Sequence, residues 1–287
     1  IGAVSVDTSI VLTNTVSGAV VSFEGGLSTP VLTTTANPYG ISLTGSNNSI
    51  VTSIEFVNTG SLALGNSSTD AFSFGGNLTV TAPSSLLIAG VFTAGGSITL
   101  GDAGTGISLS SGTSISTAGV NADININGAV TGASNTFTVR AGTGTINFGG
   151  AVSGLGATTL IANEINVSAN YAGTSTLVIA PATTSRSIYL GASSNSDTTV
   201  LNVTSAELGY LVDGFSAITI GGSVDGIAIS GGITSRSALT FKDPTTFTTT
   251  GTMTLDHDLS FASGTNASFT ISGPLVWNAG NITTGSG

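Results

Sequence analysis

Asn77-Leu-Thr-Val-Thr-Ala82 and Ser97-Ile-Thr-Leu-Gly-Asp102 belong to a series of short segments in which apolar residues alternate with small polar residues. Gly, Asn and Ser separate the segments, and further copies begin at Asp123, Thr145, Glu164, Ser187, Ala217 and Gly226. Successive side chains of a β-strand point to opposite faces, so each segment presents two apolar side chains on one face. One segment cannot bury that face alone, and repetition about every twenty residues therefore predicts stacking into a β-solenoid.

The spacing of these segments predicts the register of the stack. Leu78 and Ile98 are 20 residues apart, Ile124 and Ile146 are 22 apart, and Ile146 and Ile165 are 19 apart. We expect an all-β fold, a right-handed parallel β-helix of about 14 coils of roughly 20 residues. In that fold, one interior column contains Leu78, Ile98, Ile124, Ile146 and Ile165. The sequence shows no capping helix, so we expect uncapped ends that continue into further coils or into a neighbouring copy.

Three zones of the sequence differ in regularity. Residues 1–70 are expected to form less regular N-terminal coils, and residues 71–195 the most regular β-solenoid coils. Residues 196–287 are expected to form β-solenoid coils with a short insertion at 201–216. No charged or Pro-rich linker separates the zones, so we expect one continuous stack instead of independent domains.

The composition argues against several classes of protein. Hydrophobic residues make up 40% of the 287 residues, which is too much for a disordered chain. Charged residues make up 6%, the net charge is −10, and the Lys and Arg residues are Arg140, Arg186, Arg236 and Lys242. We therefore expect no nucleic-acid partner. No stretch approaches about 18 uninterrupted apolar residues, so we expect no direct membrane insertion.

The segment at 201–221 carries a more specific signal than the repeats. It reads Leu201-Asn-Val-Thr-Ser-Ala-Glu-Leu-Gly-Tyr-Leu-Val-Asp-Gly-Phe-Ser-Ala-Ile-Thr-Ile-Gly221 and resembles a recurrent insertion in filamentous-haemagglutinin-like and autotransporter-like bacterial surface proteins. Val203 stands where that pattern has a second Leu. The surrounding coils also resemble repeats of this family. The resemblance implies an extracellular or bacterial cell-surface location and an adhesive role, with host or surface glycans or proteins as partners. The absence of Cys fits an exported protein.

The residues of this segment predict a local structure without reference to any family. Ser205-Ala-Glu-Leu-Gly-Tyr-Leu211 favours one or two helical turns, with Thr204 or Ser205 as the N-cap. Asp213-Gly214 is then expected to turn the chain back into a strand at 217–220. The apolar stripe of the helical segment is expected to contain Leu208, Leu211 and Phe215.

Two groups of acidic residues are candidates for chemistry. Asp256-His257-Asp258 contains the single His, and in a strand its two carboxyl groups share a face, as an acid–base pair on a β-helix enzyme requires. A turn with solvated carboxylates explains the same residues. Asp102 and Asp123 are 21 residues apart, a spacing that places them in adjacent coils, where they could contribute to an incidental Ca²⁺ site.

Two repeated polar patterns are candidates for structural roles. Asn125, Asn127, Asn147 and Asn166 recur about one coil apart, which predicts an Asn ladder with amide hydrogen bonds along the stack. Five Thr residues alternate in the C-terminal third and are expected to share one strand face, where ordinary β-propensity explains them. They are Thr246, Thr248, Thr250, Thr252 and Thr254.

These observations lead to one expected function and two alternatives. We expect a structural and adhesive β-solenoid that forms the rigid stalk or fibre of a bacterial surface or secreted adhesin. The first alternative is a self-assembling extracellular filament subunit, whose open ends stack head to tail. The second is a polysaccharide-active β-helix enzyme. The expected function involves no enzyme activity, and we assign no catalytic, cofactor-binding or metal-ligating residue and no cofactor.

Overall fold

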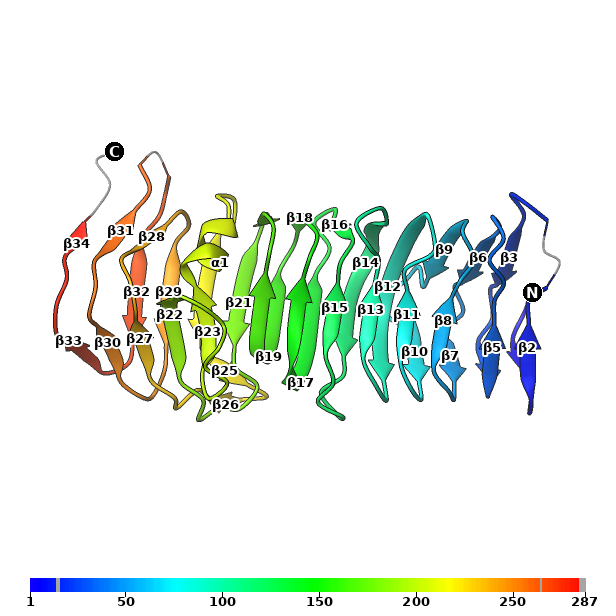
Figure 1. Cartoon of the computed structure of the whole chain (residues 1–287), viewed down its shortest axis with the longest axis horizontal. Coiled ribbons are helices and arrows are strands. Elements are labelled where there is room, and N and C mark those ends of the chain that lie inside the picture. Colours follow the sequence, from blue (N-terminus) through cyan, green and yellow to red (C-terminus); the bar gives the residue numbers. More distant parts are fainter. Residues whose placement is uncertain (14–15, 264, 284–287) are drawn as a thin grey trace.

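The chain forms a parallel β-solenoid of about 13 turns. The computed structural model describes residues 1–13, 16–263 and 265–283. Strands lie side by side along the long axis, with the N-terminus near one end and the C-terminus near the other (Figure 1). Each turn contributes strands to three faces in a fixed order, so strands of the same face stack on one another. The expectation of an all-β parallel solenoid is confirmed, with about 13 turns instead of 14.

The first face begins with eight stacked segments, two of which are the first parts of longer strands. They are β3 (Val20–Phe23), β6 (Gly40–Leu43), β9 (Ser61–Leu64), β12 (Ser85–Ala94), β14 (Gly106–Ser116), β16 (Ala129–Thr131), β18 (Val152–Leu155) and β20 (Tyr171–Gly173). Three more strands form a separate sheet nearer the C-terminus. They are β28 (Leu239–Phe241), β31 (Leu259–Phe261) and β34 (Ile282–Thr283).

The second face is a continuous parallel sheet from the N-terminal to the C-terminal coils. It contains the second parts of β12 and β14 and the first parts of two other long strands, β17 (Phe137–Phe148) and β19 (Thr158–Val167). The remaining strands are β1 (Val4–Ser5), β4 (Leu27–Thr29), β7 (Asn47–Ile50), β10 (Ala71–Phe74), β21 (Thr176–Ala180), β24 (Ala217–Gly221), β29 (Thr245–Thr248) and β32 (Phe269–Ser272).

The third face contains the second parts of β17 and β19 and eleven shorter strands. In spatial order these are β2 (Ser9–Val11), β5 (Val31–Thr33), β8 (Ile54–Phe56), β11 (Leu78–Val80), β13 (Ile98–Leu100), β15 (Ile124–Ile126), β23 (Leu201–Thr204), β22 (Ile188–Ala192), β27 (Ile233–Ser235), β30 (Met253–Leu255) and β33 (Leu275–Trp277). A hairpin of β25 (Ser223–Val224) and β26 (Ile227–Ala228) is the antiparallel exception among the described strands.

The interior column expected from the sequence is present on the third face. Leu78 pairs with Ile98, which pairs with Ile124, and the register continues through Ile146 to Ile165. All five side chains are at most 4% exposed. One residue per turn therefore contributes to an unbroken aliphatic core, and each backbone group of the column's strands bonds to the strands above and below.

Glycine is required where corners of successive turns approach closely. A Cβ atom on Gly75 would lie 1.8 Å from the carbonyl oxygen of Val51, and one on Gly95 would lie 2.3 Å from that of Gly75. Because backbone atoms cannot move away as a flexible side chain can, larger residues do not fit at these corners. The Gly-Gly pairs at 75–76 and 95–96 therefore mark corners where the chain turns from the second face to the third.

The expected Asn ladder runs along the outer side of the third face. The amide nitrogen of Asn147 donates to Asn125 at 2.8 Å, and that of Asn166 donates to Asn147 at 2.7 Å. Asn195 continues the series by donating to Asn166. Asn127 is exposed and takes no part in this series, although the sequence placed it there. The ladder thus follows the hydrogen-bond direction of the backbone and ties four turns together.

The order of strands on the third face departs from the order of the chain at one place. β22 pairs with both β23 and β27 and so lies between them, while β23 contacts β19 (Figure 1). The chain therefore skips one position, forms β22, and returns through residues 193–200 to fill the skipped position with β23. Consequently Thr176 of β21 pairs with Ala217 of β24, which is 41 residues later (217 − 176). The detour takes up more residues than an ordinary turn does. The chain therefore forms about 13 turns instead of the 14 expected from the sequence.

The boundaries of the three sequence zones fall between strands of one continuous stack. β9 and β10 lie on either side of residue 70, and β22 and β23 on either side of residue 195. The segment 201–216 contains β23 and the helix α1 (Ser205–Tyr210), whereas the out-of-order strand β22 precedes it. Residues 284–287 of the last zone lie outside the described residues.

Replacing Ile146 with Ala tests the interior column. Ile146 is fully buried, so we expect the substitution to lower the free energy of unfolding by about 2–5 kcal/mol, because it removes apolar contacts and leaves a cavity. Urea unfolding followed by circular dichroism measures the change. Val120→Ala is the control, because Val120 is 48% exposed and its truncation should change stability by less than about 0.5 kcal/mol. Equal effects of the two variants would contradict the register.

Replacing Asn147 with Ala tests the ladder separately from the core. The side chain of Asn147 both donates and accepts a ladder hydrogen bond, so its loss should cost about 1–3 kcal/mol in the free energy of unfolding. Asn127→Ala is the matched control, since Asn127 is exposed and outside the ladder. If both substitutions lower the urea midpoint equally, the amide ladder does not stabilise the stack.

Candidate functional site

The detour of the chain around β22 builds the most varied polar cluster of the described structure. Arg186 precedes β22 and donates from one terminal nitrogen to the carbonyl oxygens of Thr198 and Val200, at 2.7 and 2.8 Å. Asn202 of β23 donates to the carbonyl oxygen of Asp197 at 2.9 Å. These bonds fix the returning segment, residues 193–200, against the third face. This segment is a largely exposed loop, and these hydrogen bonds hold it in one position.

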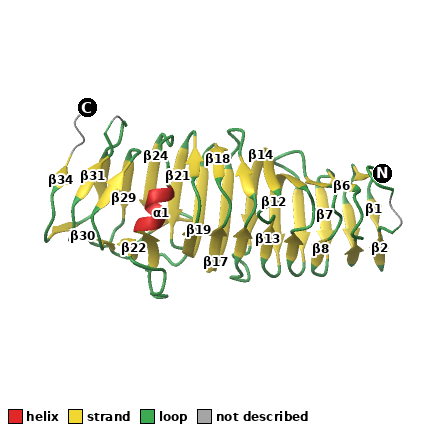
Figure 2. Cartoon of the chain, turned by 45° about the horizontal axis from the view of Figure 1, so that its top comes forward, coloured by secondary structure: helices red, strands yellow, loops and turns green. Residues whose placement is uncertain are grey.

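The helix α1 begins immediately after β23 and is the single helix of the described residues (Figure 2). Thr204 is its N-cap and forms a capping box with Glu207, whose carboxylate accepts from the Thr204 backbone nitrogen at 2.7 Å. Leu208, Leu211 and Phe215 are buried, as the sequence predicted. The expected helical turn is therefore confirmed, although of the three apolar residues only Leu208 lies within the helix, Leu211 being its C-cap and Phe215 following it. The helix also has a second role, because Glu207 extends the polar network inward.

Two carboxyl groups meet beneath the returning segment. Glu207 is 6% exposed, and its Oε1 accepts from the side chain of Asn195 at 3.0 Å. Glu164 of β19 accepts from Asn202 at 3.0 Å through Oε2, while its Oε1 is buried without a hydrogen-bond partner. Burial raises the pKa of Glu164 to about 7, and the charge of Glu207 adds to this rise, although the Asn202 hydrogen bond opposes it. Glu164 therefore changes protonation near neutral pH.

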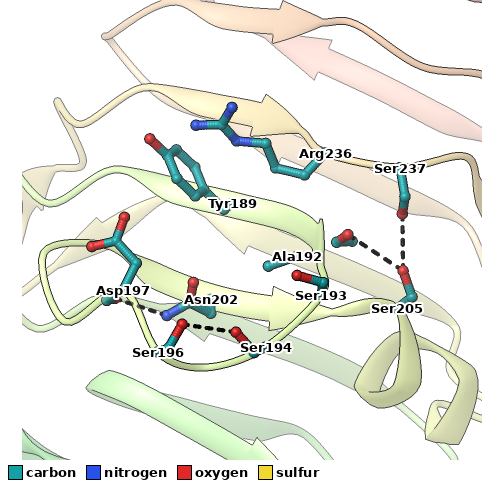
Figure 3. A pocket seen from close by; sticks show the side chains of 11 residues that line it. Tyr189, Ala192, Ser193, Ser194, Ser196, Asp197, Asn202, Ser205, Arg236 and Ser237 are labelled. Atoms are coloured by element: carbon teal, nitrogen blue, oxygen red, sulfur yellow. Dashed lines mark hydrogen bonds between the residues drawn. The ribbon is translucent and has the colours of Figure 1, made fainter.

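A polar cleft of about 390 Å³ lies on the outer side of this cluster (Figure 3). Five parts of the chain form its walls: strand β22, the returning segment, strand β23, the first residue of α1, and the residues that follow β27. The Arg236 guanidinium carbon lies 3.8 Å from the centre of the Tyr189 ring, an arrangement that stabilises the cation over the aromatic face. The polar lining residues on the other walls are Ser193, Ser194, Ser196, Asp197, Asn202, Ser205 and Ser237.

Hydrogen bonds order several of the cleft's side chains. The hydroxyl groups of Ser205 and Ser237 are 2.9 Å apart, and those of Ser194 and Ser196 are 2.8 Å apart (Figure 3). Hydrogen bonds from the side chain and backbone of Thr199 lower the pKa of Asp197, with a smaller contribution from the positive charges of Arg186 and Arg236. The cleft thus contains a cation, a carboxylate and several hydroxyl groups within one concave surface.

The acidic group considered for catalysis lies in a turn, which is the alternative that explained its residues without catalysis. Asp256, His257 and Asp258 lie in the turn between β30 and β31. Asp256 accepts from the side chain of Asn278 at 2.8 Å, and Asp258 accepts from the backbone nitrogen of Asn281 at 2.7 Å. The strand interpretation is wrong, because the turn directs both carboxylates toward the next coil, where they cap backbone and amide groups.

Corners of the coils also separate the residues of two other sequence patterns, the pair Asp102 and Asp123 and the alternating Thr residues. Asp123 directly precedes β15 and Asp102 follows β13, so register places them at opposite ends of adjacent strands instead of side by side. They do not form the expected Ca²⁺ pair, and among the described residues no three acidic or His side chains converge as a metal site. Thr246 and Thr248 belong to β29 on the second face, whereas Thr254 belongs to β30 on the third. The Thr residues therefore do not share one face.

The cleft itself was not predicted from the sequence. Tyr189 and Arg236 are 47 residues apart (236 − 189), and they meet because β22 pairs directly with β27. A regular spacing of coils gives no sign of this pairing, since it depends on the skipped position. The usable signal was the clustering of Ser, Asn and Asp at 193–198, which breaks the alternation of apolar residues.

Comparison with known protein families, with curated proteins and with solved structures found no match. The resemblance of residues 201–221 to an insertion of bacterial surface proteins thus stays an expectation from the sequence. Within the described residues, no helix has the length and apolar character needed to cross a membrane. The fold and the cleft must therefore support a functional proposal by themselves.

The raised pKa of Glu164 predicts how stability depends on pH. Between the ordinary value of 4.5 and about 7, the folded chain binds more protons than the unfolded chain. The contribution of Glu164 to the free energy of unfolding should consequently be largest below pH 4.5 and be lost as pH rises through about 7. Glu164→Gln should remove this pH dependence of the urea midpoint between pH 5 and 8. The matched control is Glu55→Gln, at an exposed position of the same face, which should leave the dependence intact. The same slope in wild type and Glu164→Gln would contradict the assignment.

Proposed function

We propose that this chain forms the rigid stalk or fibre of an extracellular adhesive protein of the bacterial surface or secreted type. The observation that supports the proposal best is the continuous parallel sheet of the second face, which connects the coils from β1 to β32. Each coil bonds to both neighbours through its backbone, so bending the rod requires many hydrogen bonds to distort together. A rod of this kind holds contact surfaces at a fixed distance from an attachment point.

The placement of the basic residues supports an exposed location where proteases are present. Arg140 forms an ion pair with Asp225 at 2.6 Å, and Arg186 is bonded to the returning segment. Lys242 donates to the carbonyl oxygen of Gly209 at 3.0 Å. Proteases that cleave after Lys or Arg need several residues in an unfolded, extended form, which a stacked coil does not provide. The chain thus offers few accessible sites to such enzymes.

A filament subunit is a second candidate, favoured by the last described coil. Leu275, Val276 and Trp277 of β33 are 44%, 44% and 50% exposed, although Leu275 pairs in register with the fully buried Met253. A strand with this pattern can accept another coil, from the same polypeptide or, in a filament, from a second copy of the chain. Trp277→Lys should then shift sedimentation from assemblies to monomers, whereas an unchanged distribution would count against head-to-tail stacking.

Small-angle scattering and limited trypsin digestion test the stalk. About 13 turns with a spacing of about 4.8 Å predict a rod about 60 Å long. We expect scattering to give the profile of a rod, and trypsin to leave the native chain intact under conditions that cleave the heat-unfolded chain. A globular profile, or equally rapid cleavage of the native and unfolded chains, would overturn the proposal.

A further inference from the structure

The Arg236 guanidinium differs from the other basic groups of the described chain. Arg140, Arg186 and Lys242 each donate to a protein oxygen. The Arg236 guanidinium, by contrast, stacks on Tyr189 and lies within the electrostatic influence of Asp197, and among the described residues no hydrogen bond from its donors is found. A cation that is held in place by an aromatic ring and keeps its donors available is suited to bind a carboxylate from outside the protein.

The surroundings of Arg236 restrict what kind of molecule carries that carboxylate. Serine hydroxyls line three walls of the cleft, and the Asp197 carboxylate can accept hydrogen bonds from hydroxyl groups of a ligand. The nearest small residues, Gly191 and Ala192, are buried and offer little apolar surface to a hydrophobic peptide. Asp197 and the net charge of −10 disfavour ligands with closely spaced charges, such as nucleic acid. A molecule with many hydroxyl groups and one carboxylate per unit fits these constraints.

The structure assigns the cleft between Tyr189, Asp197 and Arg236 to an acidic saccharide of the uronic acid class. In this assignment the sugar carboxylate pairs with the Arg236 guanidinium, and its ring hydroxyls bond to Asp197 and to the serines of the returning segment. Figure 3 shows these side chains around the cleft. The ring of Tyr189 stacks against the Arg236 guanidinium and keeps the guanidinium in one orientation. This assignment rests on the proposed adhesive function, for which it supplies the class of ligand and the place of contact.

Arg186 and Asn202 act here as positioning residues. Arg186 holds the carbonyl oxygens of Thr198 and Val200, and Asn202 holds that of Asp197, so both fix the wall that carries the Asp197 carboxylate. The binding surface is therefore ordered before the ligand arrives, which lowers the entropic cost of association. The out-of-order strand explains why this surface occurs at one place on a repetitive rod.

Calorimetric titration of the whole chain with tetragalacturonate tests the assignment. We expect binding that Arg236→Met weakens at least about tenfold, because the substitution removes the charge-assisted hydrogen bonds and keeps a side chain of similar length. The fully methyl-esterified tetrasaccharide, which lacks the carboxylate charge, should bind at least about tenfold more weakly to the wild-type chain. Arg140→Met is the matched control and should bind as the wild type does, since Arg140 lies outside this cleft and is paired with Asp225.

Three results would overturn the assignment. They are no binding of tetragalacturonate, equal binding by the wild type and Arg236→Met, and displacement of the saccharide by inorganic sulfate at equal concentration, which would indicate a simple anion site. The scattering and digestion experiments separate this assignment from the stalk. A rod without saccharide binding removes the cleft assignment alone, whereas saccharide binding by a chain that is not a rod removes the stalk alone.

Discussion

In-register hydrogen bonding between parallel coils is the constraint on which the rest of the structure depends. It requires each turn to place its strands directly over those of the turn before, and hence requires one inward residue such as Ile124 over another such as Ile98. The same geometry aligns outward residues, so Asn147 lies over Asn125 and their amides bond. It also limits the corners, where Gly75 and Gly95 are too close to neighbouring backbone to carry a side chain. Core, ladder and corners thus have one common cause.

The detour at β22 is the place where the structure departs from this repetition. The rod there buries two carboxyl groups at least in part, that of Glu207 and one oxygen of Glu164. Such burial costs free energy unless hydrogen bonds compensate, and Asn195, Asn202 and the capping box of α1 supply most of them. The ladder ends in this network. A regular stack therefore supports an irregular, ordered surface, in which chemically distinct side chains meet on an otherwise uniform rod.

The sequence predicts the repetitive parts of the molecule because they follow from local alternation and spacing. The column from Leu78 to Ile165, the helix after Thr204 and three members of the Asn ladder were found in this way. Corners were harder to place, since Gly, Thr and Asp occur both in strands and in turns. At Asp256–Asp258, for example, the sequence allowed either a strand or a turn, and the structure has a turn. The cleft could not be predicted from the sequence, because it depends on the non-local pairing of β22 with β27. The residues of the two strands do not indicate that they pair with each other.

Distances between spin labels test in-register stacking most directly, and the absence of Cys allows labels at chosen positions. Asn47 and Thr246 lie in one outward column, joined through Ala71, Val91, Ser114, Thr138, Thr159, Val178 and Thr219. Eight steps of about 4.8 Å predict a separation of about 38 Å, and five steps from Asn47 to Thr159 predict about 24 Å. Narrow distributions near both values would agree with the stack. Broad distributions, or separations that do not increase with the number of steps, would contradict it.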